Sequence, residues 1–75
     1  MVFEKIAEYA SDKFDKDIED LTLETTFEEL RAEEEDIIDM AFELSREFDI
    51  IIEEDDVYGI TDLGGLVELI NSLME

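Results

Sequence analysis

The chain has 75 residues and a formal net charge of −20, from 25 acidic and 5 basic side chains. Such a surface repels nucleic acid and anionic membranes. With no cysteine or histidine, it offers no disulfide and none of the usual ligands of a structural zinc site. The 45% of hydrophobic residues therefore predict one small domain, residues 1–75, which packing alone must stabilise.

The negative charge has two interpretations. It serves solubility alone, or it attracts basic partner proteins. We favour the second, because charge of this density repels itself and opposes folding. The longest apolar runs, such as the three isoleucines at 50–52, are far shorter than the roughly 20 residues that cross a bilayer. No signal-peptide pattern opens the chain, so we expect a soluble, cytoplasmic protein.

The first predicted helix covers residues 2 to about 15, where apolar side chains recur at steps of three and four. Its inward stripe is Phe3, Ile6, Ala7, Ala10 and Phe14. Residues 16–29 show no helical stripe, so they predict a long loop, a feature that usually has a function in a small domain. We expect four apolar residues to pin this loop to the core: Ile18, Leu21, Leu23 and Phe27.

The second predicted helix begins between Glu33 and Glu35 and ends near Phe48. Its inward stripe is Ile37, Met40, Ala41, Leu44 and Phe48. The three glutamates at 33–35 and Asp36 place negative charge at the positive end of the helix dipole, where each is worth roughly 0.3–1 kcal/mol. That stabilisation alone could explain the triple glutamate.

The last third of the chain predicts a short helical turn and one more helix. Residues 50–52 have no second strand to pair with. The turn covers residues 55–59, with Gly59 as its cap, and Thr61 is the expected N-cap of the last helix. Gly64 and Gly65 cost about 1 kcal/mol each relative to alanine, which we explain by close approach to a neighbouring helix. The stripe of this helix is Leu63, Leu66, Val67, Ile70 and Leu73.

The segment 30–40 reads Leu-Arg-Ala-Glu-Glu-Glu-Asp-Ile-Ile-Asp-Met. It resembles the attachment segment of acyl carrier proteins, Leu-Gly-Ala-Asp-Ser-Leu-Asp-x-x-Glu-Leu, whose serine carries phosphopantetheine. Residues 27–30, 47–52 and 60–63 resemble the family's flanking motifs in the same order. The resemblance covers nearly the whole chain. It implies an all-α, acyl-carrier-protein-like four-helix bundle, with three longer helices, one short helix and a long loop after the first helix.

In this register Glu34 occupies the place of the serine. A carboxylate is not a substrate for a phosphopantetheinyl transferase, so we expect no cofactor at the usual site. Ser11, Ser45 and Ser72 lie elsewhere on the predicted helices and are poor replacements. A working carrier, loaded with phosphopantetheine, remains the alternative if the register is wrong.

The resemblance also implies a docking surface on the second helix, for a basic partner such as a synthase or acyltransferase of fatty-acid or polyketide synthesis. Ile38 and Phe42 lie off the inward stripe and are candidate exposed anchors, unless the small bundle buries them. Ser45 and Arg46 stand where the family often has acids, which weakens recognition by its usual enzymes. We expect a monomer whose partner-binding residues are Glu33, Glu35, Asp36, Ile38, Asp39, Phe42, Glu43 and Glu47.

The family further implies a hydrophobic pocket between the helices, although plain core explains the same residues equally well. Its predicted lining is Phe27, Ile37, Ala41, Leu44, Ile52, Ile60, Leu66 and Ile70. Without histidine or cysteine an enzyme is not expected. The acids at 53–56 lack the ligand spacing of a calcium loop, so we predict no metal site. An acidic inhibitor or nucleic-acid mimic is a further alternative.

Overall fold

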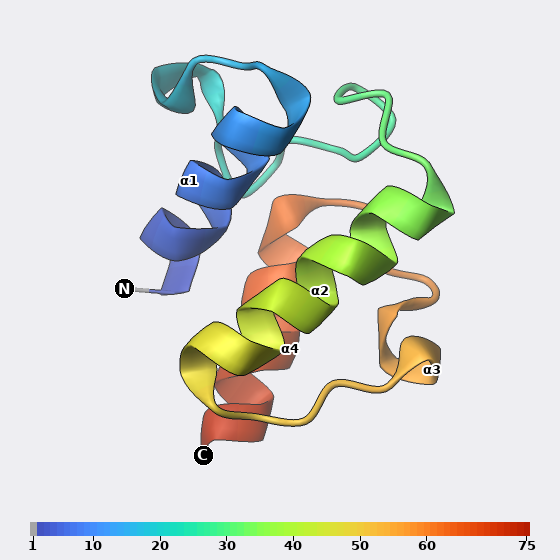
Figure 1. Ribbon diagram of the computed structural model, residues 1–75. Helices are drawn as coiled ribbons and strands as arrows, with labels where there is room; N and C mark the ends of the chain where they lie inside the picture. Colours follow the sequence, from blue (N-terminus) through green and yellow to red (C-terminus); the bar gives the residue numbers. More distant parts are fainter. Residues whose placement is uncertain (1) are drawn as a thin grey trace.

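The computed structural model describes residues 2–75, and these form four α-helices and one 3-10 turn (Figure 1). The elements are α1 (Val2–Phe14), η1 (Ile18–Asp20), α2 (Glu34–Phe48), α3 (Glu54–Val57) and α4 (Leu63–Met74). No strand occurs within that range; the sole β-type pairing there is an isolated bridge between Thr26 and Asp62. The all-α prediction is confirmed, including three longer helices, one short helix and a long loop after the first.

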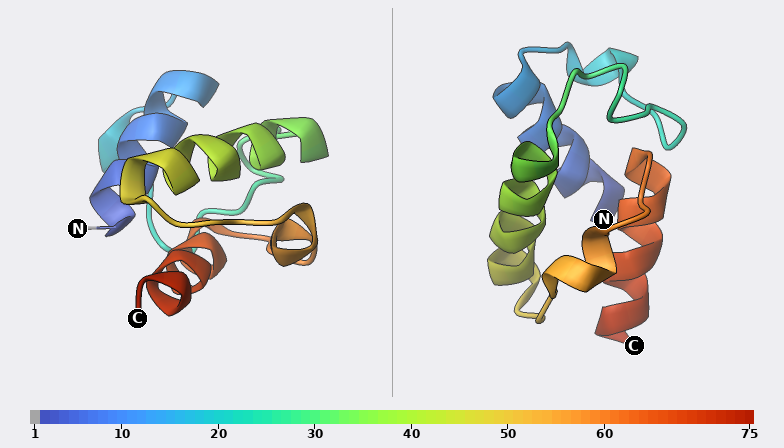
Figure 2. Two further views of the ribbon diagram at one scale, coloured as in Figure 1. Left: turned by 60° about the horizontal axis from the view of Figure 1, so that its bottom comes forward. Right: turned by 90° about the vertical axis from the view of Figure 1, so that its right-hand side faces the viewer.

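The three longer helices pack side by side, with α2 and α4 running in one direction and α1 in the other (Figures 1 and 2). Helix α1 packs mainly against α4, and α3 packs against α2. The loop between α1 and α2 covers one end of the bundle (Figure 2). This arrangement leaves the start of α2 at the edge of the molecule, beside the short helix.

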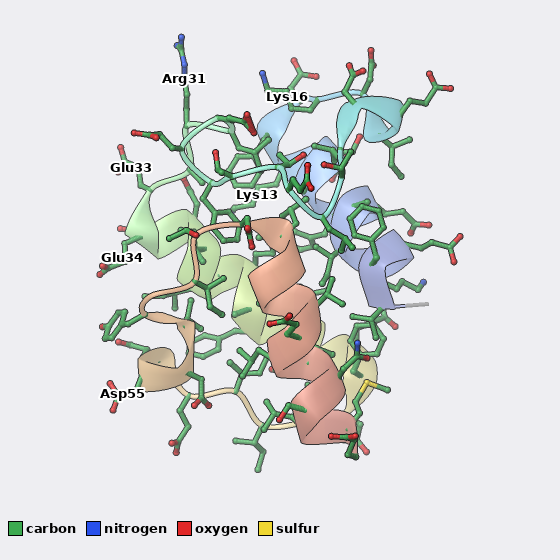
Figure 3. The ribbon with its side chains drawn as sticks, turned by 180° about the vertical axis from the view of Figure 1, so that it is seen from behind. Lys13, Lys16, Arg31, Glu33, Glu34 and Asp55 are labelled. Atoms are coloured by element: carbon green, nitrogen blue, oxygen red, sulfur yellow. The ribbon has the colours of Figure 1, made fainter. Side chains whose placement is uncertain are left out.

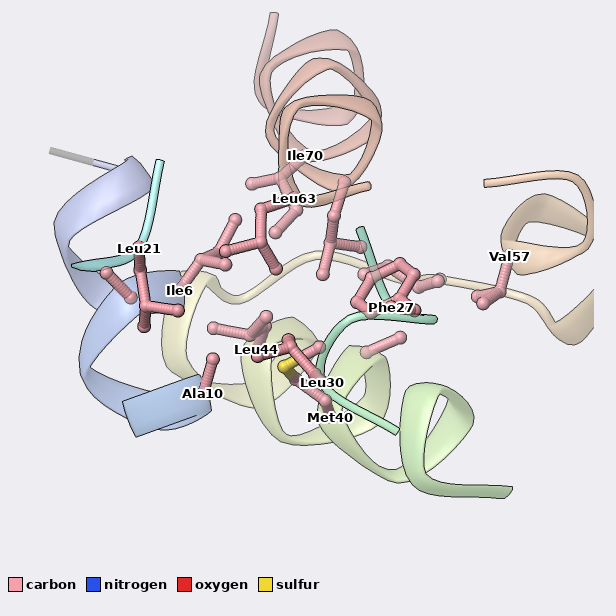
Figure 4. Close-up of a cluster of buried hydrophobic side chains, with 14 residues drawn as sticks. Ile6, Ala10, Leu21, Phe27, Leu30, Met40, Leu44, Val57, Leu63 and Ile70 are labelled. Carbon is pink, nitrogen blue, oxygen red and sulfur yellow. The ribbon is translucent and has the colours of Figure 1, made fainter. Parts of the chain in front are cut away.

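The predicted helix stripes form the core (Figure 4), except for Leu73 at the end of the last stripe, which is 38% exposed. Each long helix contributes three fully buried side chains, because residues three and four apart share one face of a helix. They are Ile6, Ala7 and Ala10 from α1, Met40, Ala41 and Leu44 from α2, and Leu63, Leu66 and Ile70 from α4. Apolar residues at the ends of the stripes, such as Phe3 and Phe48, are partly buried against this cluster.

Two of the four expected loop anchors are in the core, and two are not. Leu21 and Phe27 are buried, whereas Ile18 is 45% exposed and Leu23 is 50% exposed. The prediction was wrong for both: Ile18 begins the turn η1, in which no residue is buried, and Leu23 is held by its backbone. The Gly64 N–H donates to the Leu23 carbonyl oxygen at 2.8 Å, so the Leu23 side chain is free to face solvent.

That hydrogen bond belongs to a set that joins the long loop to the start of α4, which we call the clasp. The Leu63 N–H donates to the Thr25 carbonyl at 3.0 Å, and the Phe27 N–H donates to the Thr61 carbonyl at 3.0 Å. The first amides of a helix lack partners within it, and here the loop supplies them.

Glycine at position 64 makes the clasp possible. A Cβ atom there would lie 2.9 Å from the Leu23 carbonyl oxygen. The close approach predicted for this glycine therefore exists, but its partner is the loop and not a helix. At Gly65 an added Cβ would lie 3.0 Å from Ile60 Cγ2, a side-chain atom of the preceding segment.

The structure also corrects two predicted boundaries. Asp62, not Thr61, is the N-cap of α4, and its Oδ1 accepts a hydrogen bond from the Gly65 N–H at 2.8 Å. The Thr61 carbonyl is already committed to the clasp. The short helix covers Glu54–Val57, one residue earlier at its start than predicted, and Gly59 follows it with a φ of 92°. Glycine is favoured in that backbone conformation.

Candidate functional site

The start of α2 carries the triple glutamate. Glu33 is the N-cap and Glu34 is the first helical residue. The Glu33 N–H donates to Asp36 Oδ2 at 3.0 Å, which fixes the first turn. All three glutamate side chains are exposed, and Glu33 and Glu34 project from the same edge of the molecule (Figure 3). Their charges lie at the positive end of the helix dipole, as predicted, where they stabilise the helix.

Asp36 has a second contact that ties α2 to α1. Its Oδ1 lies 3.9 Å from Lys13 Nζ, near the end of α1. Asp36 is half-buried, and its two oxygens thus serve different partners. The contact restrains the position of the α2 start relative to the first helix.

The segment that precedes α2 forms an ordered turn. The Thr26 N–H donates to Glu29 Oε1 at 3.0 Å and the Glu29 N–H donates to Thr26 Oγ1 at 3.1 Å, a reciprocal capping arrangement. Leu30 is buried. Arg31 then adopts a φ of 58°, the left-handed conformation that costs side-chain-bearing residues energy. The turn holds the first residues of α2 at the molecular edge.

The predicted partner-binding residues divide into exposed and half-buried groups. Phe42 is 40% exposed, whereas Ile38 is partly buried against the core. Asp36 is also half-buried, and Glu43 forms an ion pair with Arg46 on the next turn. The remaining members are exposed along α2: Glu33, Glu35, Asp39 and Glu47.

A groove of about 360 Å³ lies between the start of α2 and the α3 region. We call it the α2–α3 groove, and its lining is Glu34, Ile37, Val57, Tyr58, Gly59 and Ile60. Two residues of the predicted pocket, Ile37 and Ile60, line it. The other six are buried core residues away from this lining: Phe27, Ala41, Leu44, Ile52, Leu66 and Ile70.

The sequence reasoning missed Val57, Tyr58 and Gly59 as groove residues. A four-residue helix has too few positions to show a periodic stripe, so its inward side could not be predicted. The one available signal was Val57, the single apolar residue of α3. It is 3% exposed and forms the buried part of the groove.

The rim of the groove is negatively charged. The Tyr58 hydroxyl donates to Glu54 Oε1 at 3.1 Å. This hydrogen bond and the charge of Glu54 raise the pKa of Tyr58, with smaller contributions from desolvation and from the charges of Glu34 and Asp55. Each carboxylate disfavours a second negative charge on the phenol. The groove therefore combines an apolar floor with an anionic edge.

None of the three serines lies at the start of α2. Ser45 is in the last turn of that helix, and its Oγ donates to the Phe42 carbonyl at 2.6 Å. Ser11 is in α1, where its hydroxyl bonds the Lys16 carbonyl, and Ser72 is in α4. The first turn of α2 therefore contains no hydroxyl-bearing side chain.

Within residues 2–75, no group of three or more Asp or Glu side chains is arranged to hold a metal ion. No helix in that range is long and apolar enough to span a membrane.

Sequence comparisons identify the relatives of this chain. The family profile described as "Phosphopantetheine attachment site" matches residues 4–70. An acyl carrier protein of Streptococcus thermophilus is 41% identical over 66 residues, which is 88% of this chain and 86% of the relative. An acyl carrier protein of Lactococcus lactis is 38% identical over 68 residues, 89% of this chain and 93% of the relative. The chain therefore belongs to the acyl carrier protein family of phosphopantetheine-attachment domains.

Proposed function

We propose that this chain is a non-catalytic docking module of its family that does not carry phosphopantetheine at the usual position. The observation that carries the proposal is the side chain at the first residue of α2. In the family register this residue aligns with the modified serine, and here it is the exposed carboxylate of Glu34. The helix start, with its free amides and positive dipole end, suits a phosphate. The serine hydroxyl oxygen, to which phosphopantetheine would be attached, is missing.

Three features of the structure support this register. Arg31 has a φ of 58°, and it aligns with the glycine of the family motif, the residue that adopts this conformation most easily. Leu30 and Met40 align with leucines of the motif, and both are buried. A shift of one residue in either direction would place the glycine on a residue without a positive φ.

The chemistry of attachment explains why a glutamate does not replace the serine. A serine hydroxyl loses its proton and attacks the pyrophosphate phosphorus of coenzyme A that bears pantetheine; the bond to the other phosphate breaks, adenosine 3′,5′-bisphosphate leaves, and a stable phosphodiester remains. A carboxylate in the same reaction would form an acyl phosphate, which water hydrolyses. Glu34 nevertheless keeps negative charge near where the phosphodiester of a loaded carrier would lie. The docking surface thus resembles that of a modified carrier in the sign of its charge.

The exposed face of α2 supports docking to a basic protein. Glu35, Asp39 and Glu47 are exposed on it, and Phe42 adds an apolar side chain that is 40% exposed. Acidic surfaces steer basic partners at rates that fall with salt, and a central aromatic residue is a typical binding hot spot. Because its relatives are named acyl carrier proteins, the expected partner is a synthase or acyltransferase of fatty-acid or polyketide synthesis.

Mass spectrometry tests the loss of attachment. The purified chain is incubated with coenzyme A and a broad-specificity phosphopantetheinyl transferase, and no mass gain is expected. The matched control is Glu34→Ser, which restores the hydroxyl and should gain one phosphopantetheine group at residue 34. A mass gain on the unmodified sequence would contradict the proposal and support a working carrier.

Docking requires a separate experiment. The chain should compete with a loaded acyl carrier protein for a synthase or acyltransferase from the same organism in a pull-down, and Phe42→Ala should compete less well. Failure to compete with a loaded carrier for any such enzyme would count against the docking role. It would leave the result on attachment unchanged.

A further inference from the structure

The α2–α3 groove has the build of a site for a long, mostly apolar side chain. Val57 forms its floor at 3% exposure, and Ile37 and Ile60 are half-buried at its sides. Gly59 and Tyr58 are exposed, so the groove opens to solvent. A volume of about 360 Å³ is at the small end of the range for ligand sites, roughly 300–1,000 Å³.

Glu34 leaves one charge at this groove without compensation. Its carboxylate forms no hydrogen bond or ion pair with any residue in the described part of the chain, whereas Glu54 accepts the Tyr58 hydroxyl. No lysine or arginine lines the groove. Lys13 contacts Asp36, Arg46 pairs with Glu43, and Arg31 points away from Glu34 at the end covered by the loop (Figure 3). An occupant should therefore combine an apolar stem with a positive end.

We propose that the α2–α3 groove receives a lysine side chain of a basic partner protein, which rests on the docking function proposed above. The methylene stem packs on Ile37, Val57 and Ile60, and the ammonium group pairs with Glu34. Lysine buries its stem against apolar surface in this way while its charged end stays in water. Arginine fits less well, because its apolar stem has three methylene groups where that of lysine has four, and its planar guanidinium is bulkier than a compact ammonium group.

A second hollow favours a protein over a free amine as the occupant. It adjoins the groove, shares Glu34, and has a volume of about 490 Å³. Its lining is Glu33, Glu34, Glu35, Ile38, Asp39 and Glu54, with five carboxylates and no cation. A basic protein surface can place one lysine in the groove and further cations over this hollow. A single free amine can neutralise either the groove or the adjoining hollow, but not both.

NMR titration of the uniformly nitrogen-15-labelled chain tests the inference with matched probes. Nα-acetyl-lysine amide should shift the backbone amides of Ile37, Tyr58, Gly59 and Ile60 in a saturable way. Three probes separate the contributions to binding. Nα-acetyl-norleucine amide keeps an apolar stem and lacks the charge, ammonium chloride keeps the charge and lacks the stem, and Nα-acetyl-arginine amide changes the head group. All three should bind more weakly at this groove.

Charge-matched variants separate the groove from the general acidity of the protein. Glu34→Gln should weaken binding of the lysine probe by roughly two- to fivefold, the contribution of an exposed ion pair. Glu8→Gln removes the same charge from an exposed position on α1, outside the groove and the docking face, and should leave the affinity within the error of the titration. Neither change alters a core residue, so both variants should give the spectrum of a folded protein.

Several results would overturn the inference. These are shifts spread evenly over the acidic surface, equal binding by ammonium chloride, and equal losses in the two glutamine variants. Tighter binding of octylammonium than of the lysine probe would assign the groove to a free amphiphilic amine. The result is independent of the mass-spectrometric test: a mass gain on the natural sequence defeats the proposed function, whereas loss of probe binding without a mass gain defeats this inference alone.

Discussion

Gly64→Ala should destabilise the protein through the clasp between the long loop and α4. The added Cβ would lie 2.9 Å from the Leu23 carbonyl oxygen and 3.4 Å from Leu23 Cβ. That carbonyl accepts the Gly64 N–H at 2.8 Å, so the backbone cannot retreat without losing the bond. Overpacking costs about 1–3 kcal/mol and a weakened hydrogen bond about 1 kcal/mol. The higher helix propensity of alanine stabilises the variant by about 1 kcal/mol relative to glycine. The expected net loss is about 1–3 kcal/mol.

Urea unfolding followed by circular dichroism measures this loss as a change in the free energy of unfolding. The matched control is Gly65→Ala, where the nearest atom is Ile60 Cγ2 at 3.0 Å. A side-chain methyl can move, and the propensity gain of about 1 kcal/mol offsets the contact. For a domain of this size each kcal/mol lowers Tm by roughly 4–8 °C. If Gly64→Ala is as stable as Gly65→Ala, the clasp does not require glycine and the reasoning is wrong.

Further predictions concern caps, backbone strain and titration. Asp62→Ala should lose about 1 kcal/mol of stability in urea unfolding, and Thr61→Ala less than half as much; the reverse order would restore Thr61 as the N-cap. Arg31→Gly should raise the free energy of unfolding by about 0.5 kcal/mol, because relief of roughly 1–2 kcal/mol of left-handed strain exceeds the added chain entropy. In ultraviolet titration Tyr58 should ionise above its model-compound pKa of 10.0, and Glu54→Gln should lower the value. Because the folded state holds this proton more tightly, the stabilisation is present below pH 10 and is lost as the pH rises through the folded pKa. An unshifted Tyr58 would contradict the hydrogen bond to Glu54.

The helices were predictable because their stripes are long and strongly periodic. Ile6 and Ala10 in α1, and Leu66 and Ile70 in α4, repeat at the helical period and are all fully buried. Their burial follows from local geometry. The start of α2 was also predictable, because a run of acids favours a helix N-terminus.

The contacts between distant segments could not be predicted from the same patterns. Thr61 and Asp62 are both good N-cap residues, and the choice between them depends on the clasp, in which the Thr61 carbonyl accepts from Phe27. Leu23 looked like an anchor because it is apolar, but its backbone makes the contact. Such pairings involve the tertiary arrangement, which side-chain periodicity does not encode.

The candidate site was predicted in part. Glu34, which we propose stands at the place of the family serine, is exposed at the first position of α2. The groove beside it depends on how α3 is oriented. A helix of four residues shows no periodic apolar pattern from which that orientation could be predicted. The predicted pocket therefore shares Ile37 and Ile60 with the observed groove, and its other members are core.

The pairing of α1 with α4 bears on how the chain folds as it is made. The first helix packs mainly against the last one, and the clasp joins residues 23–27 to residues 61–64. A nascent chain that still lacks residues 63–74 lacks the main packing partner of α1 and the amide donors for the Leu23 and Thr25 carbonyls. The bundle should therefore close only after the final helix has left the ribosome.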